Sequence, residues 1–386
     1  MSDSTTQFSC FAIVAPGLEP FALAEAQALG LHAVAEEGGL AWSGDARSAL
    51  VANAALRIAS RVLVRLASFE ARSFAELERH GRKIAWDRVL RAGDAVRFRV
   101  TCKKSKLYHS DAVAQRLADA ATRGVPGVRA EGGSTPDDEI DDGNDDVSLI
   151  VVRLMRDRCT VRADSSGALL HRRGYRLAAA KAPLRETIAA AMLAASAWDS
   201  TSPLVDPLCG SGTIPIEGAL LARQIAPGAH RRFAMERWPT VSPSLGESVR
   251  AELAARERPR AEAEIVGCDR DSGAIVAACS NAERAGVVKD VALAVRSLSA
   301  AAFPSAPRGW IVTNPPYGVR IGEADRVRDL WAQLGNVLRD RVPGWRLALL
   351  SPDTALERQL KIPLRAAASI SNGGIAVRIM IGDVPA

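Results

Sequence analysis

Residues 203–219 read PLVDPLCGSGTIPIEGA, and this stretch decides the fold of the second half of the chain. An apolar segment ends at Asp206, a loop with two glycines follows, and the residues from Thr213 onward predict a helix. Glycines let the backbone approach a ligand closely, and a helix N-terminus favours negative charge. No lysine follows the second glycine, so this is not a G-x-x-x-x-G-K phosphate loop. The glycines alone also fit a plain strand–helix turn.

A second strand-like segment, residues 263–271 (AEIVGCDRD), ends in acidic side chains. A carboxylate at this place, Asp269, can accept hydrogen bonds from both ribose hydroxyls of an adenosine-containing ligand. The gap from Gly212 to Asp269 greatly exceeds the usual length of about 20 residues, so we expect an insertion at residues 226–262. Asp271 is expected to cap the helix that follows.

A third strand-like segment, residues 310–318, reads WIVTNPPYG. Pro315 and Pro316 stiffen the loop, and a proline offers a carbonyl without a competing N–H. Asn314 offers an acceptor and a donor, while Tyr317 offers an aromatic face for stacking. These groups can hold the exocyclic amine of a planar base by positioning and electrostatics, without a strong base. A bare turn is the alternative interpretation.

The second half of the chain alternates between strands and helices. Apolar runs recur at residues 204–205, 264–267, 310–313 and 345–350, with alanine-rich helical stretches such as 184–197 and 272–285 between them. This alternation predicts parallel β-α-β units and an α/β doubly wound sheet, which binds its ligand at the carboxyl ends of its strands.

The first half predicts two small α+β units. Strand-like segments at residues 11–14, 62–66, 94–101 and 147–154 are combined with helical patterns at 20–29 and 110–122. Residues 131–146 (EGGSTPDDEIDDGNDD) contain eight acidic residues and no lysine or arginine, a composition that predicts a loop.

The formal net charge of +6 understates the basic character of the chain. Without the eight acids of residues 131–146, 50 basic side chains stand against 36 acidic ones, an excess of 14. Such an excess suggests a polyanionic partner, although arginine far outnumbers lysine and a compositional bias toward arginine also explains it. The six cysteines are scattered without a C-x-x-C pair, so no metal site is expected. With no apolar run long enough to span a bilayer and a polar start, the expected location is the cytoplasm.

In this order, DPLCGSGT, GCDRD and NPPYG resemble the S-adenosylmethionine (SAM) sites of amino-methyltransferases. Flanking segments narrow the resemblance: HRRGYR at residues 171–176, KAPLRET at 181–187, IAPG at 225–228 and SNGG at 371–374. With these segments the chain resembles the THUMP-containing RNA guanine-N2 methyltransferases, and in particular the N-terminal part of bacterial large-subunit ribosomal RNA methyltransferase L. Other relatives act on tRNA.

The resemblance implies a role for each motif residue. Asn314, Pro315, Pro316 and Tyr317 would hold and position the target base. SAM would be bound by Asp206, Cys209, Gly210, Ser211, Gly212, Thr213, Asp269, Ser297 and Asn314. Cys209 would serve through its small size rather than as a nucleophile. Ser297 stands where relatives often have an acid that contacts the adenine. Cofactor affinity therefore depends on whether the serine, or a backbone group, makes that contact instead.

The resemblance also implies the domain organisation. A ferredoxin-like region (residues 1–67) and a THUMP RNA-binding domain (68–165) would precede a Rossmann-like class I methyltransferase domain (166–386). Candidate RNA contacts are Lys103, Lys104, Lys106, Arg172, Arg173 and Arg176. The lysines fit a solvated loop equally well, and the arginines fit ion pairs at a domain interface. His171 has no partner in the sequence that would make it a base, and Trp238 is expected in the core.

These observations predict a SAM-dependent RNA methyltransferase that modifies the exocyclic N2 of a guanine, with 23S ribosomal RNA as the first candidate substrate and tRNA as the second. No metal and no membrane partner are expected. An adenine-N6 nucleic-acid methyltransferase is the nearest alternative, because NPPY occurs in those enzymes too. A non-catalytic RNA-binding assembly factor is the alternative from another class, and Ser297 is the residue that favours it.

Overall fold

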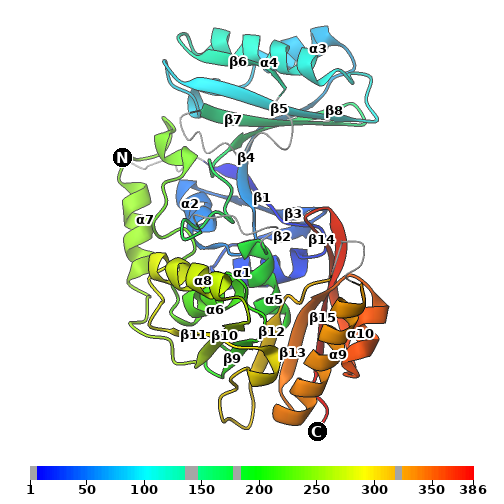
Figure 1. The fold of residues 1–386 in the computed structure, drawn as a ribbon. Helices are drawn as coiled ribbons and strands as arrows, with labels where there is room; N and C mark the ends of the chain where they lie inside the picture. Colours follow the sequence, from blue (N-terminus) through cyan, green and yellow to red (C-terminus); the bar gives the residue numbers. More distant parts are fainter. Residues whose placement is uncertain (1–6, 135–146, 177–183, 318–323) are drawn as a thin grey trace.

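The computed structural model describes residues 7–134, 147–176, 184–317 and 324–386 (Figure 1). Within these residues the chain builds an eight-stranded sheet from its first 164 residues and a seven-stranded sheet from its second half. In the same part of the chain, no helix has both the length and the apolar character needed to cross a membrane.

The N-terminal unit has the βαββαβ order of a ferredoxin-like fold, as predicted. Its elements are β1 (Phe8–Ile13), α1 (Glu19–Ala28), β2 (Val34–Glu36), β3 (Gly39–Gly44), α2 (Ala46–Ala55) and β4 (Arg61–Glu70). The strands pair antiparallel in the order β2-β3-β1-β4. Alternate residues of β1 are buried, namely Phe8, Cys10 and Ala12, because one face of the sheet packs on the two helices.

The middle unit continues the same sheet. Its elements are α3 (Phe74–Gly81), β5 (Ala95–Lys103), α4 (Ser110–Gly124), β6 (Arg129–Ser134), β7 (Val147–Met155) and β8 (Arg158–Asp164). Strand β4 pairs with β1 near its start and with β8 from Leu63 to Glu70. The predicted boundary between residues 67 and 68 therefore falls inside one strand that both units share. Residues 131–134 of the predicted acidic loop lie in β6, and residues 135–146 are outside the described residues.

The second half forms the predicted Rossmann-like sheet. Its strands are β9 (Leu204–Asp206), β10 (Ile265–Asp269), β11 (Val291–Val295), β12 (Trp310–Thr313), β13 (Arg346–Ser351), β14 (Arg365–Asn372) and β15 (Ile375–Asp383). Its helices are α5 (Glu186–Ala195), α6 (Thr213–Ala222), α7 (Leu245–Ala254), α8 (Ser272–Arg284), α9 (Ala324–Arg341) and α10 (Thr354–Leu360). The strand order is β11-β10-β9-β12-β13-β15-β14. The first five strands in this order are parallel, whereas β15 and β14 form an antiparallel hairpin at the edge that the sequence patterns did not predict.

Helices cover both faces of this sheet, which explains why its central strands are buried along their whole length. Helices α5 and α6 pack on one face, and α9 and α10 pack on the other around the fully buried Trp331. Every residue of β9 and β12 is buried. The strand order reverses beside β9, and ligands of such sheets bind at the carboxyl ends of the strands near this reversal.

The predicted insertion at residues 226–262 joins the catalytic half to the N-terminal part. Helix α7 packs on α2, and Arg47 forms an ion pair with Glu252. Farther along, Arg91 donates from Nη2 to the carbonyl of Trp238 at 3.2 Å. Trp238 is 2% exposed and packs edge-to-face on Phe8, so its predicted place in the core is confirmed.

Candidate active site

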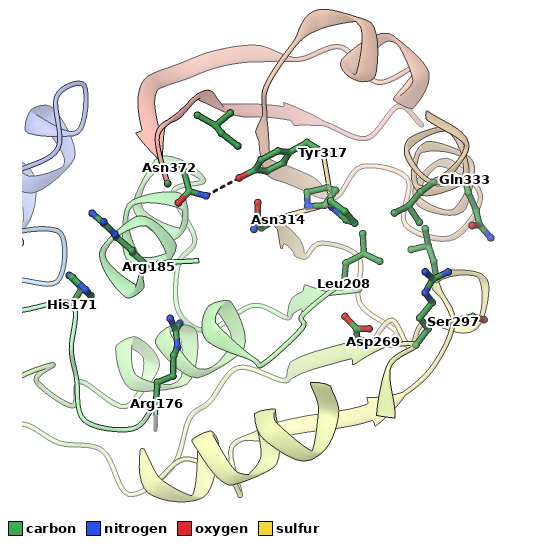
Figure 2. Close-up of a pocket in the computed structure, with 17 residues that line it drawn as sticks. His171, Arg176, Arg185, Leu208, Asp269, Ser297, Asn314, Tyr317, Gln333 and Asn372 are labelled. Atoms are coloured by element: carbon green, nitrogen blue, oxygen red, sulfur yellow. Dashed lines mark hydrogen bonds between the residues drawn. The ribbon is translucent and has the colours of Figure 1, made fainter. Parts of the chain in front are cut away.

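A pocket of about 790 Å³ opens at the carboxyl ends of β10 and β12 (Figure 2). Of the residues predicted from the motifs, it is lined by Arg176, Asp269, Ser297, Asn314, Pro315, Pro316 and Tyr317. The folded chain thus brings the NPPY loop and the acidic end of β10 into one cavity, within the 300–1,000 Å³ range typical of small-molecule sites.

Asn314 presents an unused acceptor at this pocket. The residue follows the last residue of β12, and its Oδ1 atom is buried without a hydrogen-bond donor among the described residues. Burying an amide oxygen without a donor costs free energy, so such atoms are rare in folded proteins. A ligand N–H that enters the pocket would remove this cost, which makes Asn314 a binding group for an amine.

Two side chains fix the loop that carries Asn314. The indole Nε1 of Trp331, on α9, donates to the carbonyl of Pro316 at 3.0 Å. The hydroxyl of Tyr317 accepts a hydrogen bond from Nδ2 of Asn372 at 2.9 Å (Figure 2). Asn372 ends β14, and the hairpin turn after it contains Gly373 and Gly374 with φ of +58° and +83°, a conformation that favours glycine. The unpredicted edge hairpin therefore positions the tyrosine ring.

Both carboxylate oxygens of Asp269 accept a backbone hydrogen bond. Its Oδ2 accepts from the backbone N–H of Gly210 and its Oδ1 from that of Asp271, both at 2.9 Å. A carboxylate oxygen can accept two hydrogen bonds, so each oxygen keeps one place for a ligand. Asp271 accepts in turn from the N–H of Gly273 at the start of α8, which confirms its prediction as a helix cap.

The glycine loop fits the close approach of a ligand. Gly210 has a φ of +51°, and a Cβ atom built there meets no atom within 4 Å, so this residue faces open space beside Asp269. Gly212 has a φ of +82°, and a Cβ atom there would lie 3.0 Å from Cβ of Ala278 on α8. The residues present thus fit a nucleoside cofactor: an open glycine backbone, a carboxylate with free acceptor places, and the orphaned Asn314 oxygen.

The other predicted residues of this loop lie behind the pocket wall. Cys209 is buried, and a Cβ atom at Gly267 would lie 3.2 Å from its Sγ, so the site needs a small side chain here. Burial and nearby carboxylates raise the pKa of the Cys209 thiol, which argues against a nucleophile. The carbonyl of Ser211 accepts from Asn281, and Thr213 is buried. Ser297 lines the pocket with its hydroxyl 3.1 Å from that of Ser299.

Asp206 lies under the NPPY loop rather than in the pocket. It is 2% exposed, and its Oδ1 accepts from the hydroxyl of Thr313 at 2.6 Å and from the N–H of Leu208 at 3.2 Å. Burial raises the pKa of Asp206 to about 7, with a further rise from the nearby charge of Asp269, while the two hydrogen bonds oppose the shift. The carboxyl group therefore changes its charge near neutral pH.

This shift predicts a pH dependence of stability. Between pH 4 and pH 7 the folded chain keeps a proton on Asp206 that the unfolded chain has released, so the free energy of unfolding falls as the pH rises through this window. Asp206→Asn keeps an acceptor for Thr313 but cannot ionise. Urea unfolding should show that the wild type loses about 2–3 kcal/mol more than this variant between pH 5 and pH 8. An equal difference at both pH values would contradict the buried ionisation.

Comparison with known proteins gives the family. The family model described as "RMKL-like, methyltransferase domain" matches residues 173–375, more than half of the chain. The chain belongs to the RMKL-like methyltransferases. A second model, described as "RlmL ferredoxin-like domain", matches residues 9–63, in the N-terminal unit.

Individual relatives match over nearly the whole chain. The Synechocystis sp. protein named "Putative RNA methyltransferase slr0064" is 34% identical over 98% of this chain and 97% of its own length. Ribosomal RNA large subunit methyltransferase K/L of Syntrophotalea carbinolica is 33% identical, with 97% of this chain but 53% of that protein covered. The chain thus spans about half the length of such K/L relatives.

A solved structure of a similar protein contains a product of SAM. The crystal structure of SMU.472 complexed with SAH (S-adenosylhomocysteine) is 28% identical to this chain, with a TM-score of 0.86, and the match covers 98% of this chain and 99% of that one. These matches confirm the predicted family, the Rossmann-like methyltransferase sheet after a ferredoxin-like unit, and SAM as the cofactor. No comparison tests the THUMP assignment or the roles of single site residues, which stay predictions.

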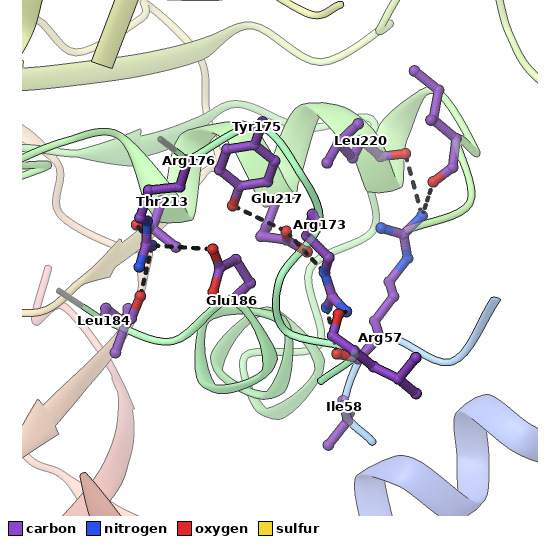
Figure 3. Close-up of polar contacts among 12 residues, drawn as sticks. Arg57, Ile58, Arg173, Tyr175, Arg176, Leu184, Glu186, Thr213, Glu217 and Leu220 are labelled. Carbon is purple, nitrogen blue, oxygen red and sulfur yellow. Dashed lines mark hydrogen bonds and ion pairs between the residues drawn. The ribbon is translucent and has the colours of Figure 1, made fainter. Parts of the chain in front are cut away.

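One predicted RNA contact of this RMKL-like methyltransferase, Arg173, is buried and paired within the chain. Arg173 is 7% exposed, and its guanidinium donates to the carbonyls of Leu170 and Arg57 at 2.6 and 2.5 Å and to Oε1 of Glu217 at 3.4 Å (Figure 3). The ion pair at a domain interface, the alternative that the sequence left open, is present in the structure. Arg57 belongs to the N-terminal unit and Glu217 to α6, so Arg173 connects the two halves of the chain.

Arg176 also has partners within the chain. Its Nη2 donates to the carbonyl of Leu184 at 2.8 Å and to the hydroxyl of Thr213 at 2.6 Å, and it lies 3.5 Å from Oε1 of Glu186 (Figure 3). Arg176 therefore connects the start of α6 to α5. It also lines the pocket, but its guanidinium is already engaged in these contacts.

The remaining predicted RNA contacts are exposed. Lys103 ends β5, and Lys104 and Lys106 lie in the connection from β5 to α4, in the middle unit at the opposite end of the molecule from the catalytic sheet (Figure 1). Arg172 is exposed beside the pocket segment and takes part in an interaction within the chain. Their contact with RNA stays a prediction.

The structure adds pocket residues to which the sequence gave no role. These are His171, Arg185, Leu208, Arg270, Leu298, Leu330, Gln333, Asn372, Gly373 and Ile375. His171, Arg185, Asn372 and Gly373 belong to segments that carried the family resemblance, which is the signal that could have found them. Gln333 lies on the amphipathic α9 and had no such signal.

Proposed function

We propose that this chain transfers a methyl group from SAM to the exocyclic N2 of a guanine in RNA, with 23S ribosomal RNA as the substrate. The observation that supports it most strongly is the buried Oδ1 of Asn314, which has no hydrogen-bond partner among the described residues and lies in a pocket that also contains Asp269. The names of the K/L relatives support ribosomal RNA as the substrate class. The cytoplasm is the proposed location.

The residues of the NPPY loop would select and orient the amine. Oδ1 of Asn314 would accept a hydrogen bond from one N–H of the guanine amine, and the buried Pro315 would offer its carbonyl to the other. Tyr317 would pack on the base, because its hydroxyl is already held by Asn372. Each group is fixed before the base arrives, so little free energy is lost in ordering the site.

SAM, when bound, supplies a methyl group that is electrophilic because it is attached to a sulfonium. Asp269, through the free acceptor places of its carboxylate, would bind the ribose hydroxyls of this cofactor. The acceptors around the amine draw its protons away from the lone pair and hold that lone pair toward the methyl group. Positioning of this kind can supply most of the acceleration, and the extra proton on the methylated nitrogen can leave to water without a dedicated base.

The target guanine would have to leave its base stack to reach the pocket. The N-terminal and middle units would hold the folded RNA mainly through its shape and its phosphates, with Lys103, Lys104 and Lys106 as proposed contacts. The excess of basic side chains supports this assignment. A middle unit of the THUMP type remains part of the proposal.

The test is methyl transfer from labelled SAM to unmodified 23S ribosomal RNA transcribed in vitro, followed by nucleoside mass spectrometry. We expect N2-methylguanosine. N6-methyladenosine would replace the proposal with the adenine alternative, and methylation of tRNA alone would change the substrate. SAM binding by calorimetry without transfer to any RNA would favour the assembly factor.

A further inference from the structure

Arg185 lines the pocket and has no ion-pair partner among the described residues. It precedes the first residue of α5, is exposed, and forms neither an ion pair nor a side-chain hydrogen bond with any described residue. Arg173 and Arg176, by contrast, are both paired with buried glutamates. The paired arginines have structural roles, which leaves Arg185 and Arg270 as the pocket arginines without an ion pair among the described residues. Arg270 follows Asp269 at the end of β10, on the side proposed for the cofactor, so Arg185 is the candidate for a different ligand.

The surroundings of Arg185 keep its charge uncompensated. The pKa of His171, which lines the same wall, is lowered to about 3, first by burial and then by the charge of Arg185 and the arginines around it. His171 is therefore neutral at physiological pH and adds no charge of its own. The positive charges that oppose protonation of His171 also attract an anion to this wall of the pocket.

The position of Arg185 relative to the base site suggests which anion it binds. In Figure 2, Asp269 and Ser297 lie on one side of Asn314, whereas Arg185 lies on the other side, where Asn372 also lies. The nucleoside end of the cofactor is proposed at Asp269, so Arg185 lies past the target base. A nucleotide that leaves its stack brings its own flanking phosphates with it, and a guanidinium can bind two oxygens of one phosphate.

We propose that Arg185 binds a backbone phosphate of the RNA next to the target nucleotide. This role rests on the proposed function, because it requires an RNA strand in the pocket. The carboxylate of the cofactor's methionine part is the other anion with matching chemistry, and the experiment below distinguishes the two.

The experiment compares the full chain with Arg185→Gln, Arg185→Lys and Arg365→Gln. Arg365 is the matched control, because it is exposed and has no ion pair among the described residues. It begins β14, and the pocket residue Asn372 ends the same strand seven residues later. At strand spacing the two residues are about 23 Å apart. Three quantities are measured for each protein: the KM for 23S ribosomal RNA, the Kd for SAM, and the salt dependence of RNA binding without turnover.

Arg185→Gln should raise the KM for RNA about tenfold and lower the slope of log affinity against log salt by about 0.7 to 0.9. Its Kd for SAM should stay within about twofold, Arg185→Lys should recover part of the loss because it keeps the charge, and Arg365→Gln should behave as the wild type. A weakened Kd for SAM with unchanged RNA affinity would assign Arg185 to the cofactor and overturn the proposal, as would no change in any quantity. If the wild type transfers no methyl group to RNA, the proposed function fails, yet the RNA-binding arm still reports on Arg185.

Discussion

Asn314→Ala is expected to lower methyl transfer to RNA about a thousandfold while SAM stays bound with nearly unchanged affinity. The substitution removes a buried acceptor of the pocket that has no hydrogen-bond partner among the described residues. Removing a single preorganised group of this kind typically costs between 10²- and 10³-fold in rate. Single-turnover rates with saturating RNA and SAM, and SAM affinity by calorimetry, give the two quantities separately.

Two controls distinguish loss of the acceptor from collapse of the loop. Asn314→Asp keeps an oxygen at the same place and should recover part of the rate, because a carboxylate still accepts from the amine. Asn372→Ala removes only the hydrogen bond to the hydroxyl of Tyr317, so its effect should be smaller than that of Asn314→Ala. A rate for Asn314→Ala within tenfold of the wild type would refute the role of this residue.

Glu217→Ala is expected to destabilise the chain by about 3–5 kcal/mol, the cost of removing one partner from a buried ion pair. The side chain of Glu217 is fully buried on α6, and its Oε1 accepts from Nε of Arg173 at 3.4 Å and from the hydroxyl of Tyr175 at 3.1 Å (Figure 3). Without it, the buried Arg173 loses its hydrogen-bonded carboxylate and keeps the carbonyls of Leu170 and Arg57 as acceptors. Chemical unfolding measured by tryptophan fluorescence gives the loss.

The surrounding residues allow matched comparisons. Tyr175→Phe removes one hydrogen bond to Glu217 and should cost about 1 kcal/mol. Glu217→Gln keeps the shape and one acceptor but removes the charge, so its cost should fall between those of the other two. Because α6 begins at Thr213, in the cofactor loop, Glu217→Ala should also weaken SAM binding. Equal stability of Glu217→Ala and Tyr175→Phe would show that the charge has no role.

The parts of the site that the sequence predicted best are those where a strand ends in a motif. Asp269 and Asn314 each follow an apolar run, and carboxyl ends of parallel strands meet at one edge of a sheet. Their place in one pocket follows from that geometry alone. The periodic patterns likewise predicted β5, α4, β7 and α8 to within a few residues of their bounds.

What the sequence could not predict depends on contacts between distant segments. The sequence around Arg173 does not distinguish an RNA-binding arginine from a buried one. The difference is its hydrogen bond to Glu217, which lies 44 residues later in the chain. The hairpin that brings Asn372 to Tyr317 joins residues 55 positions apart. The shared strand β4 was missed because two units that continue one sheet show no break in periodicity at their junction.

Strand β4 and the insertion at residues 226–262 have a joint consequence for target choice. One hydrogen-bonded strand serves both N-terminal units, and the insertion attaches them to the catalytic half through α2, Arg47 and Arg91. The distance between the pocket and the lysines at the end of β5 and just after it is then set by the fold. An RNA held at one end would present to Asn314 only those nucleotides that lie at that distance in its own fold, so the architecture itself would act as a ruler for the position of the modified base.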